Sequence, residues 1–80
     1  MTLPRDLSGA DLARALQRLG ETVTRQNGSH IRLTTKRSGE HHITVPLHNP
    51  FKVGMLSSVL REVEIHYGMT RDDLLATLFD

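Results

Sequence analysis

Three consecutive residues, Gly28-Ser29-His30, carry the side chains of this chain that are best suited to acid–base chemistry. An unperturbed histidine has a pKa near ~6.5, so it gives or takes a proton close to neutral pH. The serine hydroxyl beside it can donate or accept a hydrogen bond. The basic residues around the motif that can hold a phosphate are Arg25, Arg32, Lys36, Arg37 and Lys52. The pattern predicts a proton-transfer site next to an anion-binding one.

The segment that contains the motif, residues 21–47, alternates between apolar and polar residues and is rich in threonine, which is typical of β-strands. Two stretches that end in glycine, residues 26–28 and 37–39, divide it into three strands of an antiparallel meander. We expect each stretch to be a three-residue hairpin loop, because this choice puts all the apolar side chains on one face. The pairs expected in this register are Arg25 with Ser29, Val23 with Ile31, Lys36 with Glu40, and Leu33 with Ile43.

The expected register leaves the other face of the sheet polar. On this face His30 lies between Thr24 and Pro46, and His48 follows two residues after Pro46 with the same parity. Two histidines and Arg32 are therefore expected to gather at one end of an uncovered sheet. The even-numbered residues predicted to share this face are Thr24, His30, Arg32, Thr34, His42 and Thr44.

Cleavage of an RNA phosphodiester needs little more than such a cluster. A base activates the 2′-hydroxyl, an acid protonates the departing 5′-oxygen, and positive charge stabilises the transition state. His30 can supply either proton transfer, and His48 is the candidate for the second one. The predicted phosphate contacts come from the side chains of Ser29, Arg25, Arg32 and Lys36.

Helical patterns flank the strand segment on both sides. The spacing of leucine and alanine predicts a helix over residues 9–19, with Ser8 as its N-cap and Gly20 at its end. A second helix is expected from residue 53 or 54 to residue 66, and a short third helix follows Thr70. The predicted fold is α+β: one domain over residues 1–80, with helices on one face of a three-stranded antiparallel sheet and a short C-terminal helix.

Composition excludes several classes of protein. The 80 residues include no cysteine, so no disulfide framework, cysteine-based zinc site or thiol nucleophile is available. No metal site is expected, because the chain has neither cysteine nor a helical carboxylate–histidine pair of the metal-ligand type. No nucleotide cofactor is expected, since Gly28 is a turn glycine outside any glycine-rich phosphate loop. No apolar run is long enough for a membrane span and the N-terminus lacks a signal peptide, so we expect a cytoplasmic protein.

Of the other histidines, His41 is expected on the surface near a turn, and His66 in a structural role.

Three stretches of the chain, taken together, resemble the HicA-type toxins, the small mRNA interferases of HicA–HicB toxin–antitoxin pairs, also called the YcfA-like family. The resemblance covers residues 7–75. It departs from the family pattern in a second helix about one turn longer and in the continuation to residue 80. The stretches in question are Gly28-Ser29-His30, Ile43-Thr44-Val45-Pro46-Leu47-His48 and Gly54-Met55-Leu56-Ser57-Ser58-Val59-Leu60-Arg61.

This resemblance implies a fold like that of double-stranded-RNA-binding domains, α-β-β-β-α, and metal-independent cleavage of RNA by an endoribonuclease. It implies that His30 is the catalytic histidine and that a HicB-type antitoxin binds the protein and blocks its activity. His48 matches a motif position of the family, but its role does not transfer with the match. Two other readings of the residues stay open, a non-catalytic RNA-binding module of the same fold and a protein-interaction subunit.

Overall fold

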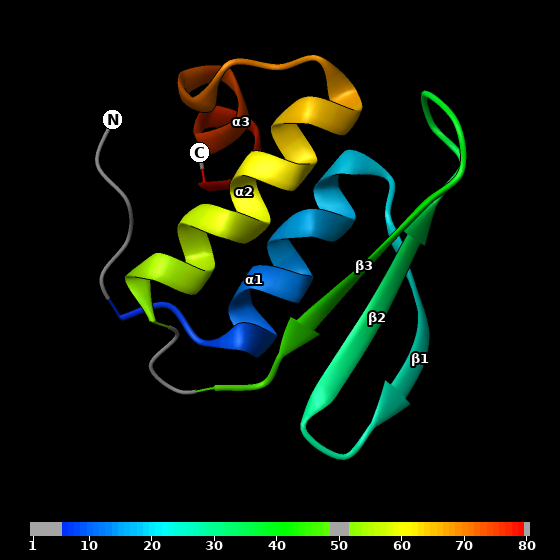
Figure 1. Ribbon diagram of the computed structural model, residues 1–80, viewed down its shortest axis with the longest axis vertical. Helices are drawn as coiled ribbons and strands as arrows, with labels where there is room; N and C mark the ends of the chain where they lie inside the picture. Colours follow the sequence, from blue (N-terminus) through cyan, green and yellow to red (C-terminus); the bar gives the residue numbers. More distant parts are fainter. Residues whose placement is uncertain (1–5, 49–51, 80) are drawn as a thin grey trace.

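A computed structural model of the protein describes residues 6–48 and 52–79. Three helices and a short helical turn form one layer, which packs on one face of an antiparallel sheet with strand order β1-β2-β3 (Figure 1). This arrangement confirms the predicted α+β class. The elements are α1 (Gly9–Leu16), the 3-10 turn η1 (Gln17–Leu19), β1 (Thr22–Asn27), β2 (His30–Thr35), β3 (His41–Pro46), α2 (Val53–Tyr67) and α3 (Arg71–Phe79).

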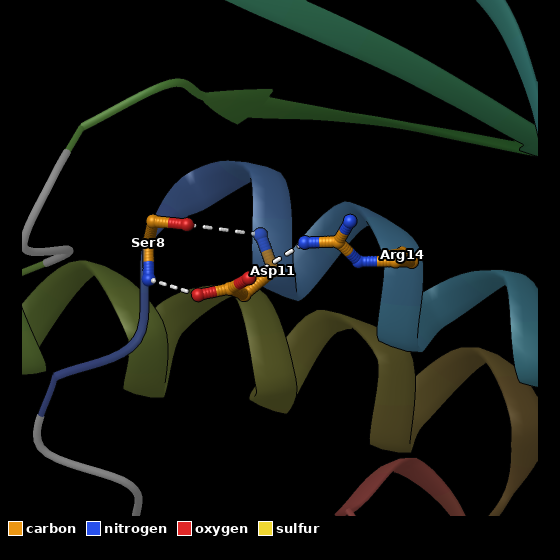
Figure 2. A network of polar contacts seen from close by, with 3 residues as sticks. All are labelled: Ser8, Asp11 and Arg14. Carbon is orange, nitrogen blue, oxygen red and sulfur yellow. Dashed lines mark hydrogen bonds and ion pairs between the residues drawn. The ribbon is translucent and has the colours of Figure 1, made fainter.

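The first helix begins at a reciprocal cap (Figure 2). The backbone N–H of Asp11 donates to the Ser8 hydroxyl at 3.1 Å, and the Asp11 carboxylate accepts from the backbone N–H of Ser8 at 3.2 Å and from Arg14 at 2.7 Å. These contacts lower the pKa of Asp11, chiefly through the Ser8 backbone N–H. The helix passes into η1 and stops at Gly20, whose φ is 93°. The expected helix over residues 9–19 is thus confirmed, with a tighter final turn.

The start of α1 lies directly against the end of β3. The backbone N–H of Gly9 donates to the carbonyl of His48 at 2.8 Å. A Cβ at Gly9 would lie 2.0 Å from the carbonyl oxygen of Pro46, so no other residue fits this close approach. Gly9 therefore sets how closely the helix layer approaches the sheet.

The second hairpin has the predicted register. Leu33 lies opposite Ile43 and His30 opposite Pro46, so β2 and β3 send the same alternate side chains into the core. The ladder ends at the pair of Thr35 with His41, so the expected pair of Lys36 with Glu40 lies one step beyond it, and the carboxylate of Glu40 is bonded to His42. Alternation of apolar and polar residues was sufficient to predict this register, because all apolar side chains of both strands must lie on the face that the helices cover.

The register predicted for the first hairpin is wrong. Arg25 faces Arg32 rather than Ser29, and Val23 faces Leu33 rather than Ile31. The strands are joined by the pair Gly28 and Ser29, with Asn27 opposite His30, and a β-bulge interrupts the ladder between Val23 and Arg25. The bulge inserts one unpaired residue, which no alternation of apolar and polar residues reveals.

The burial expected for Val23 is also wrong, since 37% of this residue is exposed although it faces the buried Leu33. β1 is the strand farthest from the helices (Figure 1), and all six of its residues are exposed. The core lies instead between the helices and the other two strands, where Leu12, Leu60 and Val45 are fully buried.

The long second helix is confirmed: α2 ends where Gly68 adopts a φ of 66°. Thr70 caps α3 by accepting the backbone N–H of Asp73 at 3.1 Å, and the Arg71 guanidinium binds the carboxylate of Glu64 on α2. The additional turn of α2 thus forms the contact surface of the C-terminal helix. No helix in the described parts of the chain is long and apolar enough to cross a membrane.

Candidate functional site

A groove of about 350 Å³ lies on the face of the sheet that the helices leave uncovered. It receives side chains from all three strands. The lining residues are Arg25, Asn27, His30, Arg32, His42 and Thr44. Of the residues predicted for the site, the structure therefore brings Arg25, Arg32 and His30 together around one cavity.

The bulge in β1 is the reason that Arg25 reaches this groove. Without it, the pairing of Val23 with Leu33 would continue to Arg25 opposite Ile31, and the arginine would share the covered face. With Thr24 left unpaired, Arg25 lies opposite Arg32 and Asn27 opposite His30, both on the open face. The residue that sequence alternation missed here is Asn27, because it belongs to the polar face only after the bulge.

Two like charges face each other in the groove. Arg25 and Arg32 are direct cross-strand partners, a placement that destabilises a sheet when nothing neutralises it. Neither guanidinium makes an ion pair with another residue of the described chain. A pair of planar donors held side by side suits a phosphate, which both can contact through two oxygens.

His30 occupies the end of the groove at the first residue of β2 and is exposed to solvent. The hydroxyl of Ser29 lies 3.2 Å from its Nδ1. When Nδ1 carries the hydrogen and donates it to Ser29, Nε2 is left with the lone pair that proton transfer requires. Ser29 thus holds the ring of His30.

His42 lines the same groove from β3, although the only sequence signal that included it was its expected position on the polar face. Its Nδ1 lies 2.8 Å from the hydroxyl of Thr34, and its Nε2 lies 3.1 Å from the carboxylate of Glu40. His30 and His42 both have even residue numbers, and this shared alternation was the signal that placed them on one face. Alternation along the sequence assigns a residue to a face of the sheet. It does not show how close that residue lies to a residue of another strand.

Two predicted site residues, Lys36 and His48, do not line this groove. Lys36 follows β2 at the second hairpin, where its carbonyl accepts the backbone N–H of Gly39. The backbone around His48 does run beside the first turn, since Leu47 donates to the carbonyl of Ser29 at 2.6 Å. The groove contains the imidazole of His42 and not that of His48.

The two remaining basic candidates lie elsewhere. The guanidinium of Arg37 donates to the carbonyl of Leu19 at 3.1 Å, which ties the second hairpin to the end of the first helix. Lys52 lines a separate groove with Met55 and Val59, between β3 and α2. Neither therefore adds charge to the groove around His30.

His41 lies near a turn, as expected, because it is the first residue of β3 after the second hairpin loop, but its side chain is only 20% exposed and is packed against α2. Its ring stacks on that of His66 with centroids 4.4 Å apart, and its Nε2 lies 3.2 Å from the carboxylate of Glu62. Adjacent residues of a strand point to opposite faces, so His41 lies under the helices while His42 lies in the open groove. His66, in turn, bonds the carbonyl of Arg37 at 2.9 Å, which fits the structural role expected for it.

Ionisable groups capable of binding a metal are dispersed. Among residues 6–48 and 52–79, no three histidine, aspartate or glutamate side chains are grouped closely enough to hold an ion. The imidazoles of His30 and His42 have the hydroxyl and carboxylate partners described above. The functional groups on the open face are imidazole, guanidinium, hydroxyl and amide groups, together with the carboxylate of Glu40.

The family model of the HicA toxin of bacterial toxin–antitoxin systems matches residues 9–65, which is more than half of the chain and includes the whole sheet. Searches of curated proteins and of solved structures give no significant match. The chain belongs to the HicA toxin family.

Proposed function

We propose that this toxin is an endoribonuclease that cleaves mRNA without a metal ion, with His30 as its general acid or base. The observation that carries the proposal is the placement of His30 beside the unneutralised pair Arg25 and Arg32. An RNA strand supplies both an anion for the two guanidinium groups and a hydroxyl next to the scissile phosphate.

The proposed reaction is an internal transesterification. Nε2 of His30 takes the proton of the 2′-hydroxyl, the oxygen bonds to phosphorus, and the bond from phosphorus to the 5′-oxygen breaks. The leaving oxygen takes a proton from water, and the resulting hydroxide takes up the proton held by His30, which gives a 2′,3′-cyclic phosphate, a 5′-hydroxyl end and a neutral imidazole. Arg25 and Arg32 stabilise the charge that develops on the phosphoryl oxygens, and Ser29 holds the imidazole in the required tautomer.

A toxin of this family is paired with an antitoxin, and we propose that the partner is a HicB-type protein. The groove is open and shallow, because three strands form its floor and the helices lie on the far side of the sheet. A protein that covers the open face would therefore exclude RNA without entering a deep cavity.

The decisive experiment compares wild type, His30→Ala and Gln26→Ala on an RNA substrate. Gln26 belongs to the same hairpin but pairs with the buried Ile31, so its removal controls for damage to the strands. We expect His30→Ala to lose about 10²- to 10⁴-fold in cleavage rate and to no longer arrest growth, with unchanged circular dichroism. Wild type should leave 2′,3′-cyclic phosphate ends, and EDTA should not reduce the rate.

Each other outcome points to a different conclusion. Cleavage or toxicity retained by a folded His30→Ala variant would overturn the assignment of His30. Loss of activity in EDTA would show a metal requirement. RNA binding that weakens with salt and yields no products would identify a non-catalytic RNA-binding module.

A further inference from the structure

A chain of hydrogen bonds crosses the open face of the sheet from β3 to β1. It begins at the carboxylate of Glu40, which lies 3.1 Å from Nε2 of His42. Nδ1 of the same ring lies 2.8 Å from the hydroxyl of Thr34, and this hydroxyl lies 2.9 Å from that of Thr24. The Thr24 hydroxyl also donates to the carbonyl of Arg32 at 3.4 Å. Side chains of all three strands thus share one network.

The network ends at the β-bulge. Thr24 is the unpaired residue between Val23 and Arg25, and its hydroxyl occupies the place of the missing ladder contact by bonding to β2. A bulge on an exposed edge strand has little packing to hold it, and all residues of β1 are exposed. The side-chain bonds of Thr24 therefore add a restraint on the register of Arg25 to that of the backbone ladder.

The Thr34 hydroxyl lies within hydrogen-bond distance of both the His42 ring and the Thr24 hydroxyl. A hydroxyl has one hydrogen to donate and two lone pairs to accept with, so it can bond both neighbours at once. Each of the two contacts therefore limits how the Thr34 hydroxyl can turn. A residue at position 42 without ring nitrogens leaves the Thr34 hydroxyl free to turn away from Thr24.

We propose that His42 is a positioning residue of the groove: through Thr34 and Thr24 it holds the bulge that turns Arg25 toward His30. This inference rests on the proposed function for its effect on RNA cleavage. Its structural consequence is independent of activity. Loss of the network lets β1 slip to the regular register, in which Arg25 faces Ile31 and one arginine leaves the groove.

The first test reads the register itself by NMR. In wild type, cross-strand NOEs should connect the backbone protons of Arg25 and Arg32. In His42→Phe and in Thr34→Val these NOEs should weaken, and NOEs between Arg25 and Ile31 should appear. Thr22→Val is the matched control, since Thr22 also pairs with Thr34 but takes no part in the chain. An unchanged pattern in both network variants would overturn the inference, whether or not the protein cleaves RNA.

The second test measures cleavage by the same variants. We expect His42→Phe and Thr34→Val each to lower kcat/KM about tenfold, and the double variant to lose no more than either single one, because both break the same chain. Thr34→Ser keeps the hydroxyl and should restore the rate, while Thr22→Val should match wild type. Additive losses, or a failure of serine to restore the rate while the fold is intact, would contradict the positioning role.

The two proposals fail in different ways. If wild type yields no cleavage products, the proposed function is wrong, and the NMR comparison still decides whether His42 holds the bulge. If His30→Ala abolishes cleavage and neither network variant changes it, the proposed function stands and the role of His42 is wrong.

Discussion

His41 and His42 are neighbours in β3, yet they meet opposite environments. The side chain of His42 is 40% exposed and lines the groove, where its ring joins a chain of hydroxyl groups. The side chain of His41 is 20% exposed and lies between the ring of His66 and the carboxylate of Glu62. The pleat of the strand alone separates the two.

The comparison extends to the carboxylates on the two sides of the sheet. Glu40 on the open side is exposed and accepts a hydrogen bond from His42. Glu21 on the covered side is only 3% exposed, and neither of its oxygens has a hydrogen bond of normal geometry within the described chain. Burial therefore raises the pKa of Glu21, although the nearby Tyr67 hydroxyl and His66 oppose the shift. The open side thus leaves its carboxylate exposed to solvent, whereas the covered side buries one among packed side chains.

The largest expected difference between the faces concerns stability. Leu33→Ala removes a fully buried side chain opposite Ile43 and should lower the free energy of unfolding by about 3 kcal/mol. Arg32→Ala, one residue away on the other face, should change it by less than about 0.5 kcal/mol, because it also relieves repulsion from Arg25. Urea titrations of both variants measure these changes in the free energy of unfolding. Comparable losses would mean that the open face carries part of the core.

The next largest effect concerns RNA affinity on the open face. Arg25→Gln and Arg32→Gln should each weaken binding of an RNA oligonucleotide about tenfold and make its salt dependence shallower by about one phosphate contact. Arg61→Gln, at an exposed position on α2, is the control for the loss of one positive charge. Equal effects of all three substitutions would indicate attraction by net charge rather than by this groove.

A smaller effect is expected from the stacked histidine on the covered face. His41→Ala should destabilise the protein by about 1 kcal/mol, through loss of the ring contact with His66 and of the contact between Nε2 and the Glu62 carboxylate. Thermal unfolding and RNA cleavage should be measured on the same preparation. Because His41 does not reach the groove, cleavage should stay at the wild-type rate below the melting temperature. A loss of cleavage in the folded variant would show that the covered face also contributes to cleavage, and would contradict the separation of roles between the two faces.

The smallest effect is expected from the buried carboxyl of Glu21, and it depends on pH. A raised pKa in the folded state means that the native protein binds this proton more tightly than the unfolded chain does. The stabilisation is complete below the ordinary value of 4.5 and is lost as the pH rises through the raised folded pKa. Glu21→Gln removes this loss, so its urea midpoint at neutral pH should exceed that of wild type. The gain should be smaller than the loss caused by His41→Ala.

The corresponding control is the pH profile of the two proteins. Wild type should lose stability relative to Glu21→Gln only as the pH rises through the window above 4.5, and the two curves should run parallel well below it. A constant offset between the curves at every pH would show that the substitution acts through packing and not through the charge of Glu21.

Local sequence signals predicted the helices correctly because each signal acts on its own neighbours. Ser8 caps α1, and the left-handed conformations at Gly20 and Gly68 end η1 and α2. Parity was equally sufficient for the pairing of Leu33 with Ile43, because both flanking strands have a covered face. The family could also be identified from the sequence, because its three motifs are short stretches whose order along the chain does not depend on the tertiary structure.

The first hairpin could not be predicted in the same way. Its outer strand is exposed along its whole length, so burial gives no preference for one register over another. The pairing of Arg25 with Arg32 depends on a bulge that is held by side chains of two other strands. For the same reason, sequence alternation missed Asn27, which joins the open face only after the bulge. Alternation did place His42 on the polar face, but it could not show that His42, and not His48, lines the groove.

By itself, the sequence determined the order of the elements, the covered faces of β2 and β3, and the motif that ends in His30. These depend on nearest-neighbour geometry and on the removal of apolar side chains from water. Only the tertiary structure decided which side chains surround His30. The groove is a contact among three strands, and its arginine pair arises from a one-residue bulge whose restraint lies across the sheet at His42.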